Sequence, residues 1–194
     1  SPEGISYPKV LCKWHGREYK DATWEDRVLI AELFPKFLKE HLDRVKMEND
    51  LKANNKLYQS MVKERPESLR RFEKFTEQPA YMSVSGGKLH DYQLEGMNWL
   101  CHSWNENTSV ILADEMGLGK TVQAISLLAY LFNDAKLTRP HLVIAPLSTL
   151  SNWARELSFW APYMNAVLYT GNGKSREIIR QNEFYYTKVK RHSR

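Results

Sequence analysis

A short glycine loop between an apolar run and a helix-forming run carries the clearest chemistry in this sequence. Residues 110–113 are all apolar, which is typical of a buried parallel strand. Gly117, Gly119, Lys120 and Thr121 follow, and apolar residues then recur at helical spacing. Glycines let backbone amides curl toward one point, and the start of a helix adds partial positive charge. With a lysine beside those amides, the pattern predicts a seat for the phosphates of a nucleoside triphosphate.

The residues of this loop have distinct expected roles. Lys120 would bridge the β- and γ-phosphates, and the Thr121 hydroxyl would ligate Mg²⁺. The strict motif has a glycine where this sequence has Asp114, so a plain glycine turn stays open as an alternative. A dinucleotide fingerprint fails, because its third glycine would stand at Val122. The predicted cofactor-binding residues of the loop are Asp114, Glu115, Met116, Gly117, Leu118, Gly119, Lys120 and Thr121.

The sequence on both sides of the loop extends the pattern. Residues 89–96 read LHDYQLEG, residues 145–150 read APLSTL, and an Asn-Trp pair follows at 152–153. In this order and spacing the motifs resemble the first recombinase-like lobe of the Swi/Snf-type ATPases of helicase superfamily two. DEMGLGKT is the usual phosphate loop there, so Asp114 is expected in that family. Residues 78–162 resemble in particular the chromodomain-helicase-DNA-binding remodellers, above all their first subfamily.

Gln93 is the second candidate site residue. A side-chain amide both donates and accepts hydrogen bonds, so it can pair with the N6 and N7 edge of adenine. The place of Gln93 upstream of the loop resembles the adenine-reading glutamine of the family, which implies ATP with Mg²⁺ as the cofactors. The simpler alternative is a solvated glutamine near a helix start. His90 and Tyr92 are further candidates for packing near the base.

Ser148 and Thr149 form the third candidate site. They would lie where a strand ends and a helix begins, which is where ligands bind in open α/β sheets. Exposed hydroxyls and helix-start amides suit a DNA phosphate, and the resemblance implies a DNA contact here. Capping of the following helix by either hydroxyl would also explain these residues.

The expected fold class is α/β: a partial RecA-like ATPase lobe, with a parallel sheet and flanking helices, preceded by a small chromodomain-like β+α module. Strand–helix alternation favours such a sheet, with right-handed crossovers. The expected strands are 109–113, 141–145 and 166–170, and the expected helices are 89–105, 119–132 and 149–160. The expected domains are a partial chromodomain at 1–46 (the second of a tandem pair), a helical linker at 47–87, and lobe 1 at 88–194, cut before its DEAH motif.

The chromodomain resemblance depends on a KWxG…ATWE pattern near the N-terminus. Strands are expected at 10–14 and 22–25, followed by a helix that starts near Pro35. Methyl-lysine readers hold the ammonium in a cage of aromatics. Trp14 matches one wall of the cage, but Arg17 stands where a second aromatic is expected. Trp14 and Trp24 are therefore predicted as core or interface residues, and histone-tail binding is expected to be weak.

Composition narrows the class of protein further. The 194 residues are 42% hydrophobic, and no apolar run approaches the length of a membrane span, so no membrane partner is expected. The two cysteines lack CxxC spacing, which argues against a disulfide framework or a zinc site. Residues 174–194 hold 7 basic and 2 acidic residues, while the remaining charges balance. This tail is either a solvated end or a contact for a phosphate backbone.

The resemblance implies a nuclear enzyme that uses ATP to translocate DNA on nucleosomes, with DNA and histones as partners. The acidic residues after Thr121 do not form a paired motif at the end of an apolar strand. We therefore expect no nucleotide turnover by these 194 residues alone. The alternative is a non-catalytic chromatin-binding module or a truncated pseudo-enzyme, which would bind histone peptide without nucleotide.

Overall fold

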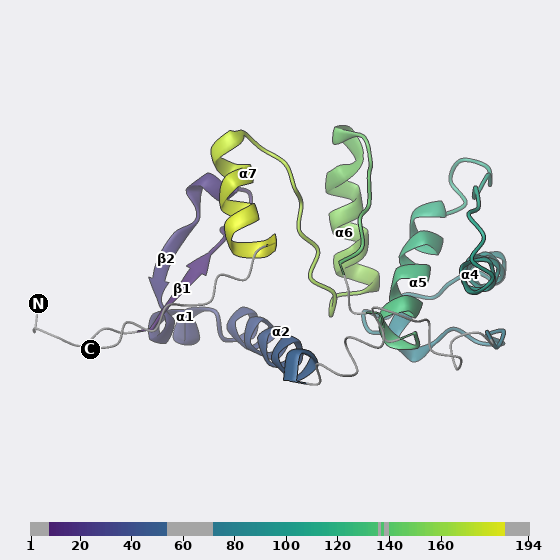
Figure 1. Ribbon diagram of the computed structural model, residues 1–194, viewed down its shortest axis with the longest axis horizontal. Coiled ribbons are helices and arrows are strands. Elements are labelled where there is room, and N and C mark those ends of the chain that lie inside the picture. The colour runs from purple at the N-terminus through teal and green to yellow at the C-terminus, as the bar shows by residue number, and fades with distance from the viewer. Residues whose placement is uncertain (1–7, 54–71, 136, 138–139, 185–194) are drawn as a thin grey trace, which may run out of the picture. The chain divides into compact units, whose positions relative to one another are not determined.

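The computed structural model describes residues 8–53, 72–135, 137 and 140–184 (Figure 1). Contacts divide the chain into two units: unit 1 comprises residues 1–46 and 167–194, and unit 2 comprises residues 47–166. The sequence analysis placed 167–184 with the ATPase lobe, whereas these residues pack on the N-terminal residues of unit 1. The domain boundaries given above stay a prediction.

Unit 1 begins with a two-stranded antiparallel sheet. Strand β1 (Lys9–Cys12) pairs with β2 (Thr23–Asp26), and Leu11 lies opposite Trp24. Both strands fall within one or two residues of the predicted positions. The Trp14 indole donates to the Thr23 hydroxyl at 2.9 Å. It also packs edge-to-face with Phe34, with the two ring centroids 6.1 Å apart. Trp24 is 60% exposed, so of its two predicted roles the core role is wrong for this unit, and the interface role stays a prediction.

Two helices follow the hairpin. Asp26 ends β2 and caps α1 (Arg27–Leu33), because its carboxylate accepts from the Val28 amide at 2.7 Å. Helix α2 (Pro35–Ala53) starts at the predicted proline, whose fixed φ and missing N–H suit a first helical position. Ile30 and Leu38 are buried in this unit.

The last described segment of unit 1 is a helix that was not predicted from the sequence. Asn172 caps α7 (Gly173–Ile179) by accepting from the Ser175 amide, and a π-helical turn, η5 (Arg180–Phe184), continues it. The Ser175 hydroxyl donates to Glu18, and the Tyr19 hydroxyl donates to Glu183, each within 3.0 Å. Tyr19 lies in the short turn η1 (Tyr19–Asp21). Burial, with the Glu183 charge, raises the pKa of Tyr19, so its phenol stays the donor.

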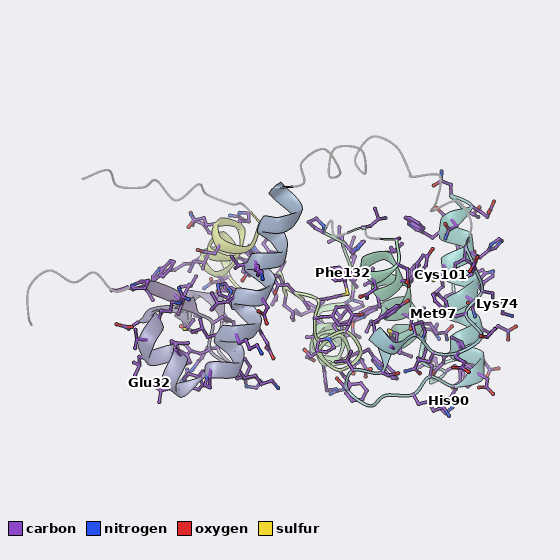
Figure 2. The ribbon with its side chains drawn as sticks, turned by 90° about the horizontal axis from the view of Figure 1, so that it is seen from below. Glu32, Lys74, His90, Met97, Cys101 and Phe132 are labelled. Carbon is purple, nitrogen blue, oxygen red and sulfur yellow. The ribbon has the colours of Figure 1, made fainter. Side chains whose placement is uncertain are left out.

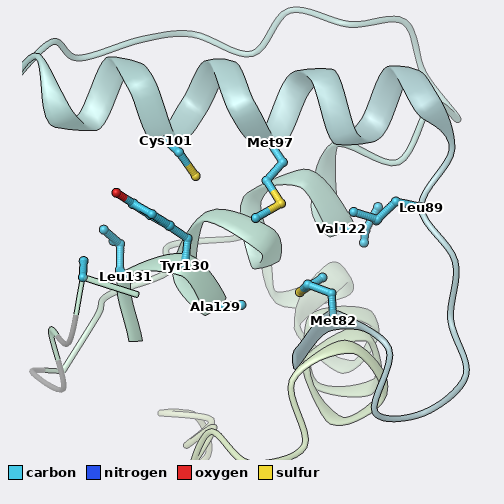
Figure 3. Packing of buried hydrophobic residues seen from close by; sticks show 9 residues of the cluster. Met82, Leu89, Met97, Cys101, Val122, Ala129, Tyr130 and Leu131 are labelled. Carbon is cyan, nitrogen blue, oxygen red and sulfur yellow. The ribbon is translucent and has the colours of Figure 1, made fainter. Parts of the chain in front are cut away.

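Unit 2 is built on two helices that pack against each other. These are α4 (Asp91–Asn105) and α5 (Lys120–Asn133), and both were predicted to within two residues. Their buried side chains pack with three from the flanking segments (Met82, Leu89 and Ala135) in one cluster (Figure 3). The cluster contains Met82, Leu89, Met97, Cys101, Val122, Ala129, Tyr130, Leu131 and Ala135. Met97 and Cys101 face the core from α4 (Figure 2). A third helix, α6 (Leu150–Trp160), packs on α5, and its apolar side chains are half-buried except for the exposed Phe159.

Two side-chain amides, from the half-buried Gln78 and the buried Asn98, hold the segment before α4 in place. Gln78 donates to the carbonyls of Met82 and Gly87 and accepts from the Leu89 amide. Asn98, on α4, bonds both the N–H and the C=O of Phe75. These side chains satisfy backbone groups that a helix would satisfy internally.

The predicted helical linker is therefore only partly present. Helix α2 continues to Ala53, and residues 54–71 lie outside the described residues. Between residues 72 and 87 the only helical element is the single turn η3 (Ala80–Met82). No helix among the described residues is long and apolar enough to cross a membrane.

The expected parallel sheet is not confirmed. The described residues 109–113, 141–145 and 166–170 contain no strand. In the first two of these segments Ile111, Leu142 and Ile144 are 84–88% exposed. A strand needs hydrogen-bonded neighbours, and no such ladder is present for these segments among the described residues.

His141 gives a testable pH dependence of stability. Its ring is half-buried, and its Nε2 is buried without a hydrogen-bond partner among the described residues. Burial lowers the pKa of His141 below its ordinary 6.5, against a smaller opposing effect from the Leu137 backbone. The unfolded chain therefore takes up a proton at a higher pH than the folded chain does.

We expect the His141 contribution to the free energy of unfolding to be complete above the unfolded pKa and to fall as the pH drops through about 6.5. Urea titrations from about pH 7.5 to about pH 5.5 on the wild type and His141→Gln would measure this. The wild type should lose more stability than the variant over this range. Equal losses would contradict the prediction.

Candidate nucleotide site

Two glycines bend the loop that leads into α5. Gly117 has φ +91° and Gly119 has φ +80°, in the left-handed region where a β-carbon is unfavourable. Gly119 is also the N-cap of α5 and has no side chain to cap the helix. The first amides of α5 are therefore open to an anion, which the helix dipole also favours.

The Lys120 ammonium lies inside the curve of this loop. Its Nζ donates to the carbonyl oxygen of Asp114 at 2.7 Å and to that of Glu115 at 2.9 Å. These acceptors are neutral, and no ion pair of Lys120 is found among the described residues. A phosphate would offer the ammonium a charged acceptor in place of two neutral ones, so the arrangement is suited to an anionic ligand.

Gln93 lies against the same loop, although 25 residues separate it from Leu118. Its side chain is 8% exposed, its Oε1 accepts from the His90 amide at 3.0 Å, and its Nε2 donates to the Leu118 carbonyl at 3.2 Å. Gln93 is therefore not the solvated glutamine of the simpler alternative. At the start of α4 the exposed His90 and Tyr92 rings are stacked, with ring centroids 5.3 Å apart and nearly parallel planes.

The other loop residues differ in what they present. The side chain of Met116 is 96% exposed and that of Leu118 is 37% exposed, and Glu115 is exposed as well. These residues would serve a phosphate through their main chain. Thr121 is half-buried on the first turn of α5, directly after Lys120. Together the backbone amides, one ammonium and one hydroxyl form a donor set that fits Mg·ATP.

Gln123 is a site residue that the sequence analysis missed. It is fully buried on α5, and its Nε2 donates to the Asp114 carboxylate at 2.9 Å. The sequence carries no separate signal for this role, because the burial of Gln123 and its contact with Asp114 appear only in the folded chain. The contact joins the helix after the loop to the residue that departs from the strict glycine motif.

Ser148 and Thr149 lie in the single turn η4 (Leu147–Thr149), directly before α6, and both are exposed. Neither caps α6: Thr149 is the N-cap residue but makes no side-chain cap bond, and its hydroxyl donates to the Pro146 carbonyl instead. The capping expectation is wrong because the η4 turn takes up this hydroxyl.

A separate open groove of about 340 Å³ lies along α4. The residues that line it do not include the loop: Phe72, Lys74, Glu95, Asn98, Trp99 and His102. Although it is concave, it has no cluster of open backbone amides, so the loop is the better candidate for phosphate binding.

Comparisons with known proteins agree with these features. The SNF2-related domain matches residues 92–189, and the chromo (CHRromatin Organisation MOdifier) domain matches residues 2–44. Chromodomain-helicase-DNA-binding protein 1 is 46% identical in Gallus gallus and 45% identical in Homo sapiens, each over 186 residues. The CHD3-type chromatin-remodeling factor PICKLE of Arabidopsis thaliana is 43% identical over 180 residues. These alignments cover 93–95% of the chain but only 10–12% of the relatives, so the chain spans about a tenth of their length.

Proposed function

Because the chain belongs to the SNF2-related domain family and also matches the chromo domain, we propose that Gln93 and residues 114–121 bind Mg·ATP. The observation that carries the proposal is the Lys120 ammonium, which lies within the curved loop on two neutral carbonyls. The open first turn of α5 and the adjacent Gln93 amide support it.

Each side chain has a defined part in this proposal. Lys120 exchanges its two carbonyl acceptors for the β- and γ-phosphates, and the amides of Gly117 to Thr121 bond the phosphate oxygens. The Thr121 hydroxyl would ligate Mg²⁺, which would neutralise charge on the phosphates. Gln93 exchanges its bond to the Leu118 carbonyl for the edge of adenine, near the stacked His90 and Tyr92 rings.

For the whole protein we propose ATP-driven DNA translocation on nucleosomes, in the nucleus. The names of these relatives, which include chromodomain, helicase, DNA-binding and chromatin remodelling, support this proposal. The lobe would then be RecA-like, with 109–113 and 141–145 as strands, as the exposed apolar side chains of Ile111, Leu142 and Ile144 favour. Nucleotide turnover by the 194 residues alone is still not expected, because the acidic residues after Thr121 do not form a paired motif.

Contacts with DNA and histones complete the proposal. Ser148 and Thr149 would contact a DNA phosphate, and their exposure supports this role now that capping does not explain them. Trp14 is engaged by Thr23 and Phe34, which supports an architectural role rather than a full methyl-lysine cage. Histone contact through this module would therefore be weak.

Competition against a fluorescent ATP analogue with Mg²⁺ tests the nucleotide assignment. We expect unlabelled ATP to displace the probe more effectively than GTP, and Gln93→Ala to remove this preference by weakening ATP roughly tenfold. Inorganic tripolyphosphate, which lacks a base, serves as the matched ligand. Gln93→Ala should lose less affinity for tripolyphosphate than for ATP. No saturable binding by the wild type, or an unchanged ATP preference in the variant, would contradict the proposal.

A further inference from the structure

Gln123 lies between the two helices that frame the loop. It follows Lys120 by one helical turn on α5, and its side chain is fully buried. Its Nε2 donates to the Asp114 Oδ2 at 2.9 Å. Its Oε1 is buried and has no hydrogen-bond partner among the described residues. Burying an unpaired acceptor is unfavourable, so the core keeps this amide at a cost in stability.

The opposite helix is shaped around the same amide. Gly96 stands in the interior of α4, where glycine is a poor helix former. A β-carbon at position 96 would lie 1.8 Å from the Gln123 Oε1, which no side chain can accommodate without movement. The glycine therefore leaves room for the Gln123 amide at the place where it reaches Asp114.

The Asp114 carboxylate is close in sequence and in space to the Lys120 ammonium, because the carbonyl of the same residue accepts from Nζ at 2.7 Å. Yet the ammonium contacts that carbonyl, while the carboxylate accepts from Gln123. If the carboxylate were released, it could pair with the ammonium directly. A charged internal partner would then compete with a phosphate for Lys120.

We propose that Gln123 is a positioning residue that holds the Asp114 carboxylate away from Lys120 and so keeps the ammonium available to a polyphosphate. Gly96 is part of this device, since it provides the space for the Gln123 amide. The inference rests on the nucleotide site proposed above and adds to it the reason why an aspartate is tolerated in this phosphate loop.

The test measures affinity of the 194-residue chain for inorganic tripolyphosphate with Mg²⁺. Gln123→Ala should weaken binding roughly tenfold, because the freed carboxylate competes for Lys120. Adding Asp114→Asn to Gln123→Ala removes that charge and should restore most of the affinity. Loss of packing alone predicts no such rescue, so a double variant as weak as Gln123→Ala would overturn the proposal.

A ligand-free readout checks the Gly96 contact. Gly96→Ala should lower the Tm, because its methyl group meets the Gln123 Oε1. In the double variant with Gln123→Ala the methyl group has room, and alanine favours the helix, so the Tm should exceed that of Gly96→Ala. A double variant less stable than Gly96→Ala would contradict the contact.

The two proposals fail differently. A wild type that does not bind tripolyphosphate would overturn the nucleotide site, whatever the Tm values of the Gly96→Ala variants are. A wild type that binds, with Gln123→Ala binding equally tightly, would overturn only the role of Gln123. If Gln123→Ala does not fold, Gly96→Ala can replace it, because its methyl group displaces the Gln123 amide without removing it. Gly96→Ala is then compared with the double variant that also carries Asp114→Asn.

Discussion

Replacing Lys120 by alanine is expected to weaken binding of Mg·ATP by roughly 30-fold to 100-fold, which corresponds to about 2–3 kcal/mol. The variant loses the single full positive charge that the described loop directs inward, at Nζ. It keeps the backbone amides of α5, so residual weak binding is expected rather than none. A fluorescent ATP analogue, titrated by anisotropy with Mg²⁺ present, measures the loss.

Lys88→Ala is the matched control, because Lys88 is an exposed lysine before α4 and makes no ion pair among the described residues. It removes the same charge from the chain and should bind within about twofold of the wild type. Similar losses in both variants would mean that affinity follows overall charge. That result would contradict a specific role for Lys120.

Replacing Gly119 by alanine is expected to have the second largest effect. The residue has φ +80°, which is costly for alanine, and its β-carbon would lie 2.4 Å from the Gln93 Nε2. The Gln93 amide would have to leave the Leu118 carbonyl. We expect about 2–3 kcal/mol less stability, from the backbone strain and the lost hydrogen bond, and weaker ATP binding. Urea denaturation and the same titration measure the two effects.

Gly117→Ala separates strain from contact. Gly117 has a similar φ of +91°, but a β-carbon there meets nothing within 4 Å. In Gly117→Ala the free energy of unfolding should therefore fall by about 1–2 kcal/mol from strain alone, and the preference for ATP over GTP should remain. Equal effects of both substitutions on stability and on base preference would show that Gln93 does not contact the Gly119 position as described.

The helices of unit 2 could be predicted because their signals are local. The apolar spacing of 120–133 and the run from Asp91 follow from helical periodicity, and α4 and α5 end within two residues of the expected positions. The hairpin of unit 1 is equally local, since alternation and a Gly16 turn mark β1 and β2. Helix α7 was missed, although Asn172 before a run with Ile178 and Ile179 was an available capping signal.

Features that depend on distant partners could not be predicted. The strand prediction for 109–113 used hydrophobicity, but a strand forms only where another segment completes its ladder. Gly96 and Gln123 carry no separate signal in the sequence, and their relation appears only when α4 packs on α5. Trp24 was predicted as core or interface because the aromatic cage is incomplete, yet in unit 1 it is 60% exposed and therefore not part of the core.

The candidate site was partly predictable for the same reason. The loop and Lys120 are contiguous, so the residue types alone indicated a phosphate seat. The bond from Gln93 to the Leu118 carbonyl could be found only in the tertiary structure. The same holds for the two contacts of Asp114, whose carbonyl accepts from Lys120 while its carboxylate accepts from Gln123. The hydroxyl of Thr149 was predicted as a cap candidate and instead bonds Pro146.

The central claim is that the amides of the loop and of the first turn of α5 hold the phosphates. Amide ¹H–¹⁵N chemical shifts, recorded during a titration with Mg·ATP and then with Mg·tripolyphosphate, test it most directly. Both ligands should shift the amides of Gly117 to Thr121 most, and only ATP should also shift those of His90 to Gln93. Shifts confined to the groove between Phe72 and His102, or none at saturating ligand, would contradict the account.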